Sequence, residues 1–184
     1  VYMVLFYHCT ISFSIRKPRI YSLSTNPIHR AIMDAANAMC QEEIQMEQRE
    51  RIIRRWFDMW LRAEDSGIRD IFAPDCVYTE SWGPEYHGAA QVKHWFDEWN
   101  TRGRVLVWDI KRFFHQNDQT AVEWYFKNRM QDGRVEEFDG ISLIRWTADG
   151  KIASLKEFGC NIHTYDPYAD GPVPHFRDEN AGWF

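Results

Sequence analysis

The chain has 184 residues, which is enough to bury the core of one domain of ordinary size. Its net charge of −5 provides no basic surface for nucleic acid, and its four scattered cysteines fit free thiols better than a disulfide framework or a zinc site. Nine tryptophans are more than such a core usually needs, so they indicate an aromatic-lined cavity, an aromatic interface, or both.

Residues 1–32 differ in composition from the rest of the chain, because they contain four basic residues and no Asp or Glu. Their apolar stretch VYMVLFYHCTISFSI is shorter than a membrane-spanning helix, and its basic residues follow it, whereas a secretory signal has them in front. We therefore expect residues 1–32 to be a poorly ordered extension outside the fold, with Met33 as a plausible native start. A signal anchor is the weaker alternative, and we expect a cytoplasmic protein that does not enter a membrane.

Residues 33–162 are expected to form the domain, and residues 163–184, which are rich in Pro and Gly, an extended tail. From 41 to 64 the apolar residues recur in pairs every four positions, which predicts one long amphipathic helix. A short second helix follows, ending at Pro74-Asp75, and a third is predicted over 89–101.

The remaining segments are typical of strands. CVYTESW is the first, and RVLVWDIKRFFHQ, TAVEWYFKNRMQ, RVEEFDGISLIRW and KIASLKEFGCNI follow, several of them separated by Gly-containing turns. The predicted fold class is α+β: a cone-shaped, curved antiparallel sheet wrapped around three helices. Large residues expected on the outer face of the sheet, such as Tyr125 and Phe113, need cover, so we expect a homodimer.

This order of elements resembles the nuclear transport factor 2-like superfamily, in its SnoaL-like branch, over about residues 45–162. The segment RIIRRWFDMWLRAEDSGIRDIFAPDCVYTESWG aligns without gaps with the start of the bacterial ketosteroid isomerases, and DGKIASLKEFG resembles their closing strand. The resemblance implies an α+β barrel whose wide end holds a pocket, and dimers formed through the sheet.

The resemblance also places functional residues one by one. The general-base aspartate of the isomerases falls on Glu80, which is still a carboxylate. Their oxyanion tyrosine falls on Trp56, whose indole can only donate an N–H, and their second oxyanion acid falls on Ser142. The base is kept and the oxyanion pair is not, which removes the strongest reason to expect a steroid isomerase.

Three residues are candidates for acid–base catalysis. Glu80 shares its strand parity with Tyr78 and Trp82, so we expect it to point into the cone, where burial raises its pKa. Glu157 has inward-facing parity in the closing strand, so its side chain would lie beside Glu80 in the pocket. The alternative is that Glu157 only forms a salt bridge. His87 is expected near the pocket rim, as a proton carrier or as a residue that holds a loop.

Further side chains are candidates for binding a ligand. Asp139 precedes a strand glycine that could mark a bulge, which would re-aim its side chain. Sequence alone does not separate pocket wall from plain core, and core is the safer prediction for Trp60. The ligand-binding candidates are Trp56, Tyr78, Trp82, Trp99, Trp124, Phe126, Asp139 and Ser142.

Two classes of function fit these features. The first is a soluble enzyme that isomerises, dehydrates or hydrolyses a small, largely apolar or aromatic molecule, with Glu80 as the acid or base. The second is a non-catalytic domain of the same fold that holds a small molecule or a protein partner. No nucleotide loop, helical His pair or Ser/His/Asp pattern is present, so we expect no cofactor and no metal.

Overall fold

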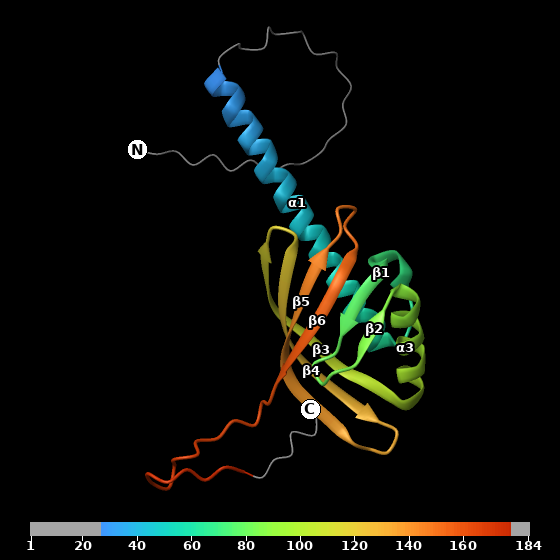
Figure 1. Ribbon diagram of the computed structural model, residues 1–184, viewed down its shortest axis with the longest axis vertical. Coiled ribbons are helices and arrows are strands. Elements are labelled where there is room, and N and C mark those ends of the chain that lie inside the picture. The colour runs from blue at the N-terminus through green and yellow to red at the C-terminus, as the bar shows by residue number, and fades with distance from the viewer. Residues whose placement is uncertain (1–26, 178–184) are drawn as a thin grey trace. The chain divides into compact units, whose positions relative to one another are not determined.

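The computed structural model describes residues 27–177, and Figure 1 shows the arrangement of the elements. The chain divides into two compact units, residues 1–40 and 41–184, and everything described below about the site belongs to the second. In chain order the elements are α1 (Pro27–Arg62), α2 (Ile68–Ile71), β1 (Phe72–Thr79), β2 (Glu85–His87), α3 (Ala89–Arg102), β3 (Gly103–Gln116), β4 (Gln119–Met130), β5 (Val135–Trp146) and β6 (Ile152–Cys160).

The six strands form one curved sheet in the order β2-β1-β6-β5-β4-β3. Strands β3 to β6 are an antiparallel meander, and β1 pairs with β2 antiparallel and with β6 in parallel. The sheet does not close, because β2 and β3 remain its two edges. The predicted α+β class with a curved sheet around helices is confirmed; the short strand β2 and the parallel pair were not predicted.

Helix α1 supplies the core with a stripe of side chains on its C-terminal half. Ile53, Trp56, Phe57 and Trp60 are all buried, at the spacing of one helix face. The helix begins at residue 27 and not near 41, because residues 27–40 contain several alanines and form helix without a buried face. The burial stripe could therefore predict only the inner half of this helix.

Strand β1 begins at Phe72, so Pro74 and Asp75 lie within a strand and do not end a helix as expected. The register between β1 and β6 shifts between Phe72 and Val77. Proline has no N–H for a ladder hydrogen bond, and an interrupted pairing removes the need for one. Pro74 is thus tolerated next to the centre of the sheet.

Phe113 is not an outward-facing residue, which corrects one of the expectations above. The β3–β4 register shifts between Ile110 and Arg112, and Phe113 then lies opposite the fully buried Val122. Its ring lies under the Arg54 guanidinium of α1, 4.9 Å from the ring centroid. The shift moves this side chain to the inner face of the sheet.

The two ends of the chain carry the remaining expectations. Residues 161–177 contain no helix or strand, and residues 1–26 and 178–184 of the predicted extension and tail lie outside the described residues. None of the helices within residues 27–177 combines the length and apolar character needed to cross a membrane.

Candidate functional site

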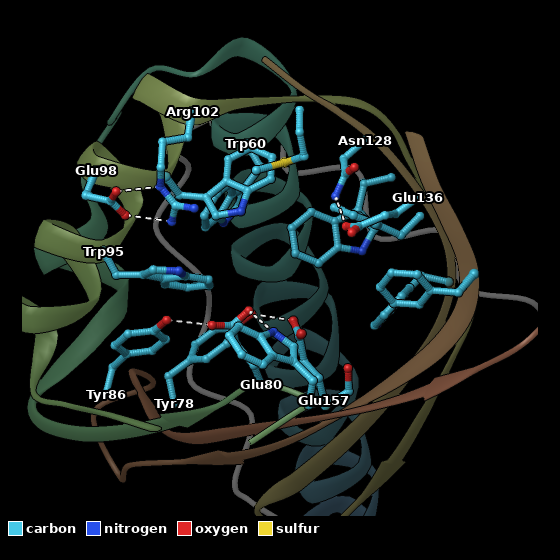
Figure 2. Close-up of a pocket in the computed structure, with 18 of the residues that line it drawn as sticks. Trp60, Tyr78, Glu80, Tyr86, Trp95, Glu98, Arg102, Asn128, Glu136 and Glu157 are labelled. Atoms are coloured by element: carbon cyan, nitrogen blue, oxygen red, sulfur yellow. Dashed lines mark hydrogen bonds and ion pairs between the residues drawn. The ribbon is translucent and has the colours of Figure 1, made fainter. Parts of the chain in front are cut away.

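A cavity of about 520 Å³ lies between the concave face of the sheet and helices α1 and α3 (Figure 2). Helix α3 presents Trp95, Trp99 and Arg102 to it, at the i, i+4, i+7 spacing of one helix face. Strand β4 presents every second residue in the same way. The aromatic part of the wall consists of Trp60, Tyr78, Trp82, Tyr86, Trp95, Trp99, Trp108, Trp124, Phe126 and Phe138.

Glu80 lies in this cavity immediately after β1 and is held by two neutral donors. The Tyr86 hydroxyl donates a 2.5 Å hydrogen bond to Oε1, and Trp82 Nε1 donates a 2.9 Å hydrogen bond to Oε2. A tight turn fixes its backbone, since Glu80 N–H donates to the Pro84 carbonyl. Burial raises the pKa of Glu80, and the two hydrogen bonds and the more distant charge of Arg102 oppose that rise.

Glu157, on β6, is the second carboxyl group of the cavity. It accepts a hydrogen bond from the Tyr78 hydroxyl on the adjacent strand β1 (Figure 2). The residue is partly exposed and lines the cavity, and protein atoms crowd around its carboxyl group. This burial, together with the nearby charge of Glu80, raises the pKa of Glu157 to about 8, although the Tyr78 hydrogen bond lowers it. Glu157 is therefore mostly protonated at neutral pH.

Two polar pairs also line the cavity. Arg102 donates from Nε and one terminal nitrogen to Glu98, at 2.5 and 2.9 Å, across one turn of α3. On the sheet, Asn128 Nδ2 donates a 3.0 Å hydrogen bond to Glu136. Figure 2 shows both pairs at the periphery of the cavity, away from Glu80 and Glu157.

Seven of the predicted site residues line the cavity together: Glu80, Glu157, Tyr78, Trp82, Trp99, Trp124 and Phe126. Trp82 is 57% exposed, which places it at the rim, whereas Tyr78 and Trp124 are buried. The expected inward direction of Glu80 and Glu157 is therefore what the structure has, and their roles remain proposals.

His87 and Asp139 are not placed in the cavity, and this corrects both expectations. In the β1–β2 pairing Tyr86 lies opposite Tyr78, so Tyr86 faces inward and His87 outward. The His87 side chain is 67% exposed and lies 3.2 Å from Glu85. No register shift occurs at Asp139, so the expected bulge is absent there; the side chain keeps its outward parity and pairs with Lys111 at 2.7 Å.

Trp56 and Ser142 are also not cavity-lining residues, because both lie one layer deeper. Trp56 is fully buried, and its ring packs edge-on against Trp60, 5.5 Å between centroids. Ser142 is fully buried and accepts a 2.9 Å hydrogen bond from Trp124 Nε1. Ser142 thus orients a wall residue and has no surface for a ligand.

Comparisons with known proteins agree with this architecture. The family model of the SnoaL-like domain matches residues 53–155, more than half of the chain. The chain belongs to the SnoaL-like family. No curated protein sequence matches it significantly.

Several solved structures share the fold of this SnoaL-like chain at low sequence identity. A Bacillus subtilis protein provisionally named an isomerase has a TM-score of 0.56 at 14% identity, over 63% of this chain and 88% of its own. A Xanthomonas campestris pv. campestris protein provisionally named a polyketide cyclase has a TM-score of 0.52 at 14% identity, over 64% and 93%. A Catenulispora acidiphila DSM 44928 protein with a ketosteroid isomerase-like fold, in complex with trimethylamine, has a TM-score of 0.50 at 18% identity, over 58% and 83%.

The SnoaL-like domain contains site residues that sequence reasoning missed. Tyr86 belongs to a strand of three residues, which is too short to give an alternating pattern. Trp95 falls on the apolar stripe of α3, where a core role is the ordinary expectation; its ring stacks on Tyr86, with 4.5 Å between ring centroids, and lines the cavity. Trp60 is buried, as expected for a core residue, and its ring also forms part of the cavity wall.

Proposed function

We propose that this SnoaL-like protein is an enzyme that transfers protons on a small, largely apolar molecule without a cofactor. The supporting observation is the pair of carboxyl groups, Glu80 and Glu157, that reach one aromatic cavity with different hydrogen-bond partners. Isomerisation, dehydration and hydrolysis are the reaction types that such a pair serves.

Glu80 takes the role of the base. Each of its oxygens accepts a hydrogen bond from a neutral donor, and such bonds favour the ionised carboxylate without neutralising it. Its burial keeps the pKa above the ordinary value, which is the direction that a base working near neutrality needs. Glu80 would accept a proton from a carbon or an oxygen of the substrate.

Glu157 takes the role of the acid. Its proton is retained at neutral pH because its pKa is raised to about 8, and Tyr78 already donates to Oε1. The proton on Oε2 of Glu157 can pass to a carbonyl or leaving-group oxygen of the substrate while Glu80 removes a proton from another atom of the substrate. One proton is gained and one is lost in this step, so the site needs no further reactant for an isomerisation.

The test begins with a thermal-shift screen of small carbonyl and aromatic compounds. Each compound that binds is then followed by NMR in D₂O for exchange of its acidic C–H groups and for conversion. Glu80→Gln keeps the shape of the side chain but removes the base, so we expect exchange to slow by about 10²-fold or more. His87→Gln, which alters an exposed residue outside the cavity, is the matched control and should exchange at the wild-type rate.

Two results would contradict the proposal. Exchange that survives in Glu80→Gln would show that Glu80 is not the base. Compounds that bind in the cavity but never exchange or convert would favour the non-catalytic binding domain.

A further inference from the structure

The charges that line the cavity are not balanced around its two central acids. Arg102 pairs with Glu98 at 2.5 Å, and Arg134 lies 3.5 Å from Glu136. His94 also lines the cavity, and the hydrogen bonds from Arg102 and the electrostatic effect of His94 lower the pKa of Glu98. Within residues 27–177, no Lys, Arg or His side chain forms an ion pair with Glu80 or Glu157. The hydrogen bonds that the structure gives to these two carboxyl groups come from tyrosine and tryptophan.

Aromatic rings form the cavity wall around these acids. Trp95 stacks on Tyr86 with an interplanar angle of 17°, and Trp99 packs edge-on against Trp60. A tryptophan face is electron-rich and attracts cations. Where a Lys or Arg lies over a ring within residues 27–177, that ring is outside the cavity. Among the described residues, therefore, no Lys or Arg lies over a tryptophan face of the site.

Unpaired polar atoms in the wall give an independent indication. Asn128 is only 4% exposed; its Nδ2 donates to Glu136, which fixes the orientation of the amide, and its buried Oδ1 has no donor. A buried acceptor without a donor is costly, and a hydroxyl group on a ligand could donate to it. The buried N–H groups of Trp60 and Trp108 also lack partners among the described residues.

We propose that the ligand of this cavity is a small organic ammonium ion that carries alkyl groups and an oxygen atom. Its charged nitrogen lies beside the Glu80 carboxylate, among the aromatic rings of the wall. Its alkyl groups contact these rings, and its oxygen lies toward the polar periphery of the cavity. This names the substrate class of the proposed function, and it depends on that proposal only in placing the ligand in the same cavity.

The test compares two molecules of nearly equal shape by isothermal titration calorimetry on the full chain at neutral pH. Protonated N,N-dimethylethanolamine and 3-methylbutan-1-ol differ in that a charged N–H group replaces a C–H group. We expect the amine to bind about ten-fold more tightly or better, because cation–π attraction and the negative charge of Glu80 act only on the charged molecule. Equal or tighter binding of the alcohol would overturn the proposal, as would no amine binding at millimolar concentration.

Variants then locate the effect. Glu80→Gln and Trp99→Leu should each reduce the preference for the amine, whereas Glu137→Gln changes an outer-face acid and should not alter it. An undiminished preference in the first two variants, with folding checked by circular dichroism, would show that the charge is recognised elsewhere. The comparison in the wild-type protein does not depend on the variants.

The two proposals can fail separately. If a neutral compound binds more tightly than the amine and its C–H exchange depends on Glu80, the ammonium proposal is rejected and the enzymatic proposal stands. If the amine is bound selectively but no compound is ever converted, the enzymatic proposal is rejected and the ammonium site stands.

Discussion

Replacing Glu157 by glutamine should change how the stability of the protein depends on pH. The substitution keeps the side-chain shape and an acceptor for Tyr78, but it removes the titrating group. In the folded protein burial raises the pKa of Glu157 to about 8, from an ordinary value of 4.5. The folded state therefore binds more protons than the unfolded state between these two values. Stability from this group is highest below pH 4.5 and falls as the pH rises toward 8.

The size of the effect follows from the two pKa values. Each rise of one pH unit well inside this window lowers the free energy of unfolding by about 1.4 kcal/mol, and the last unit before the folded pKa lowers it by less. Between pH 6 and pH 8 the free energy of unfolding of the wild-type protein should therefore fall by about 2 kcal/mol more than that of Glu157→Gln. For a domain of this size that difference corresponds to roughly 4–8 °C in Tm. Contributions from groups that do not interact with Glu157 are present in both proteins and cancel in the comparison.

The measurement is urea unfolding at pH 6, 7 and 8, followed by far-UV circular dichroism. Glu137→Gln is a matched control, because Glu137 accepts a 2.5 Å hydrogen bond from Tyr125 but lies on the outer face. The hydrogen bonds from Tyr125 and Lys127 lower the pKa of Glu137, so its removal should leave the pH dependence above 6 unchanged. Parallel pH curves for the wild type and Glu157→Gln would refute the assignment of Glu157 as a protonated acid.

Three further outcomes are expected. Gly140→Ala should cost about 1–3 kcal/mol in urea unfolding, because a Cβ there would overlap the buried ring of Trp124; an unchanged midpoint would contradict this packing. The protein should be a homodimer through the outer face of β5 and β6, where Leu143 and Phe158 are exposed, and light scattering that gives the 22.0 kDa monomer at micromolar concentration would disprove it. A chain that begins at Met33 should keep its Tm, since the helical residues just before it are exposed; a fall of several degrees would show that the deleted segment packs on the domain.

Much of the fold could be predicted because burial on one face leaves a period in the sequence. Apolar and polar residues alternate along 119–131, which is typical of a strand with one covered face; this segment is β4, and Trp124 and Phe126 line the cavity. The same parity placed Glu80 beside Tyr78, and the last strand placed Glu157 inward. These are local properties of a strand, and they hold whatever the rest of the chain does.

The rest of the site depends on contacts that no local pattern contains. Trp56 and Trp60 share one helix stripe, yet only Trp60 reaches the cavity, because the packing of α1 against the curved sheet decides which ring is covered. Arg102 reads as an ordinary charged residue at a helix end, and its place in the cavity wall depends on how α3 lies over the sheet edge. The prediction for His87 was wrong because strand β2 has only three residues, too few to show which side chains face inward.

The parallel pairing of β1 with β6 also has a consequence for the order in which the site is assembled. Tyr78 and Glu157 are 79 residues apart, and their hydrogen bond joins a strand made early in synthesis to the last strand of the sheet. Strand β1 therefore gains its central neighbour only after the whole meander has formed, and such long-range pairing slows folding. A growing chain that has reached β5 holds Glu80 and the aromatic rings but not its second acid. The two carboxyl groups meet only when the domain is complete, so the proposed proton-transfer site does not exist in any partly built form of the protein.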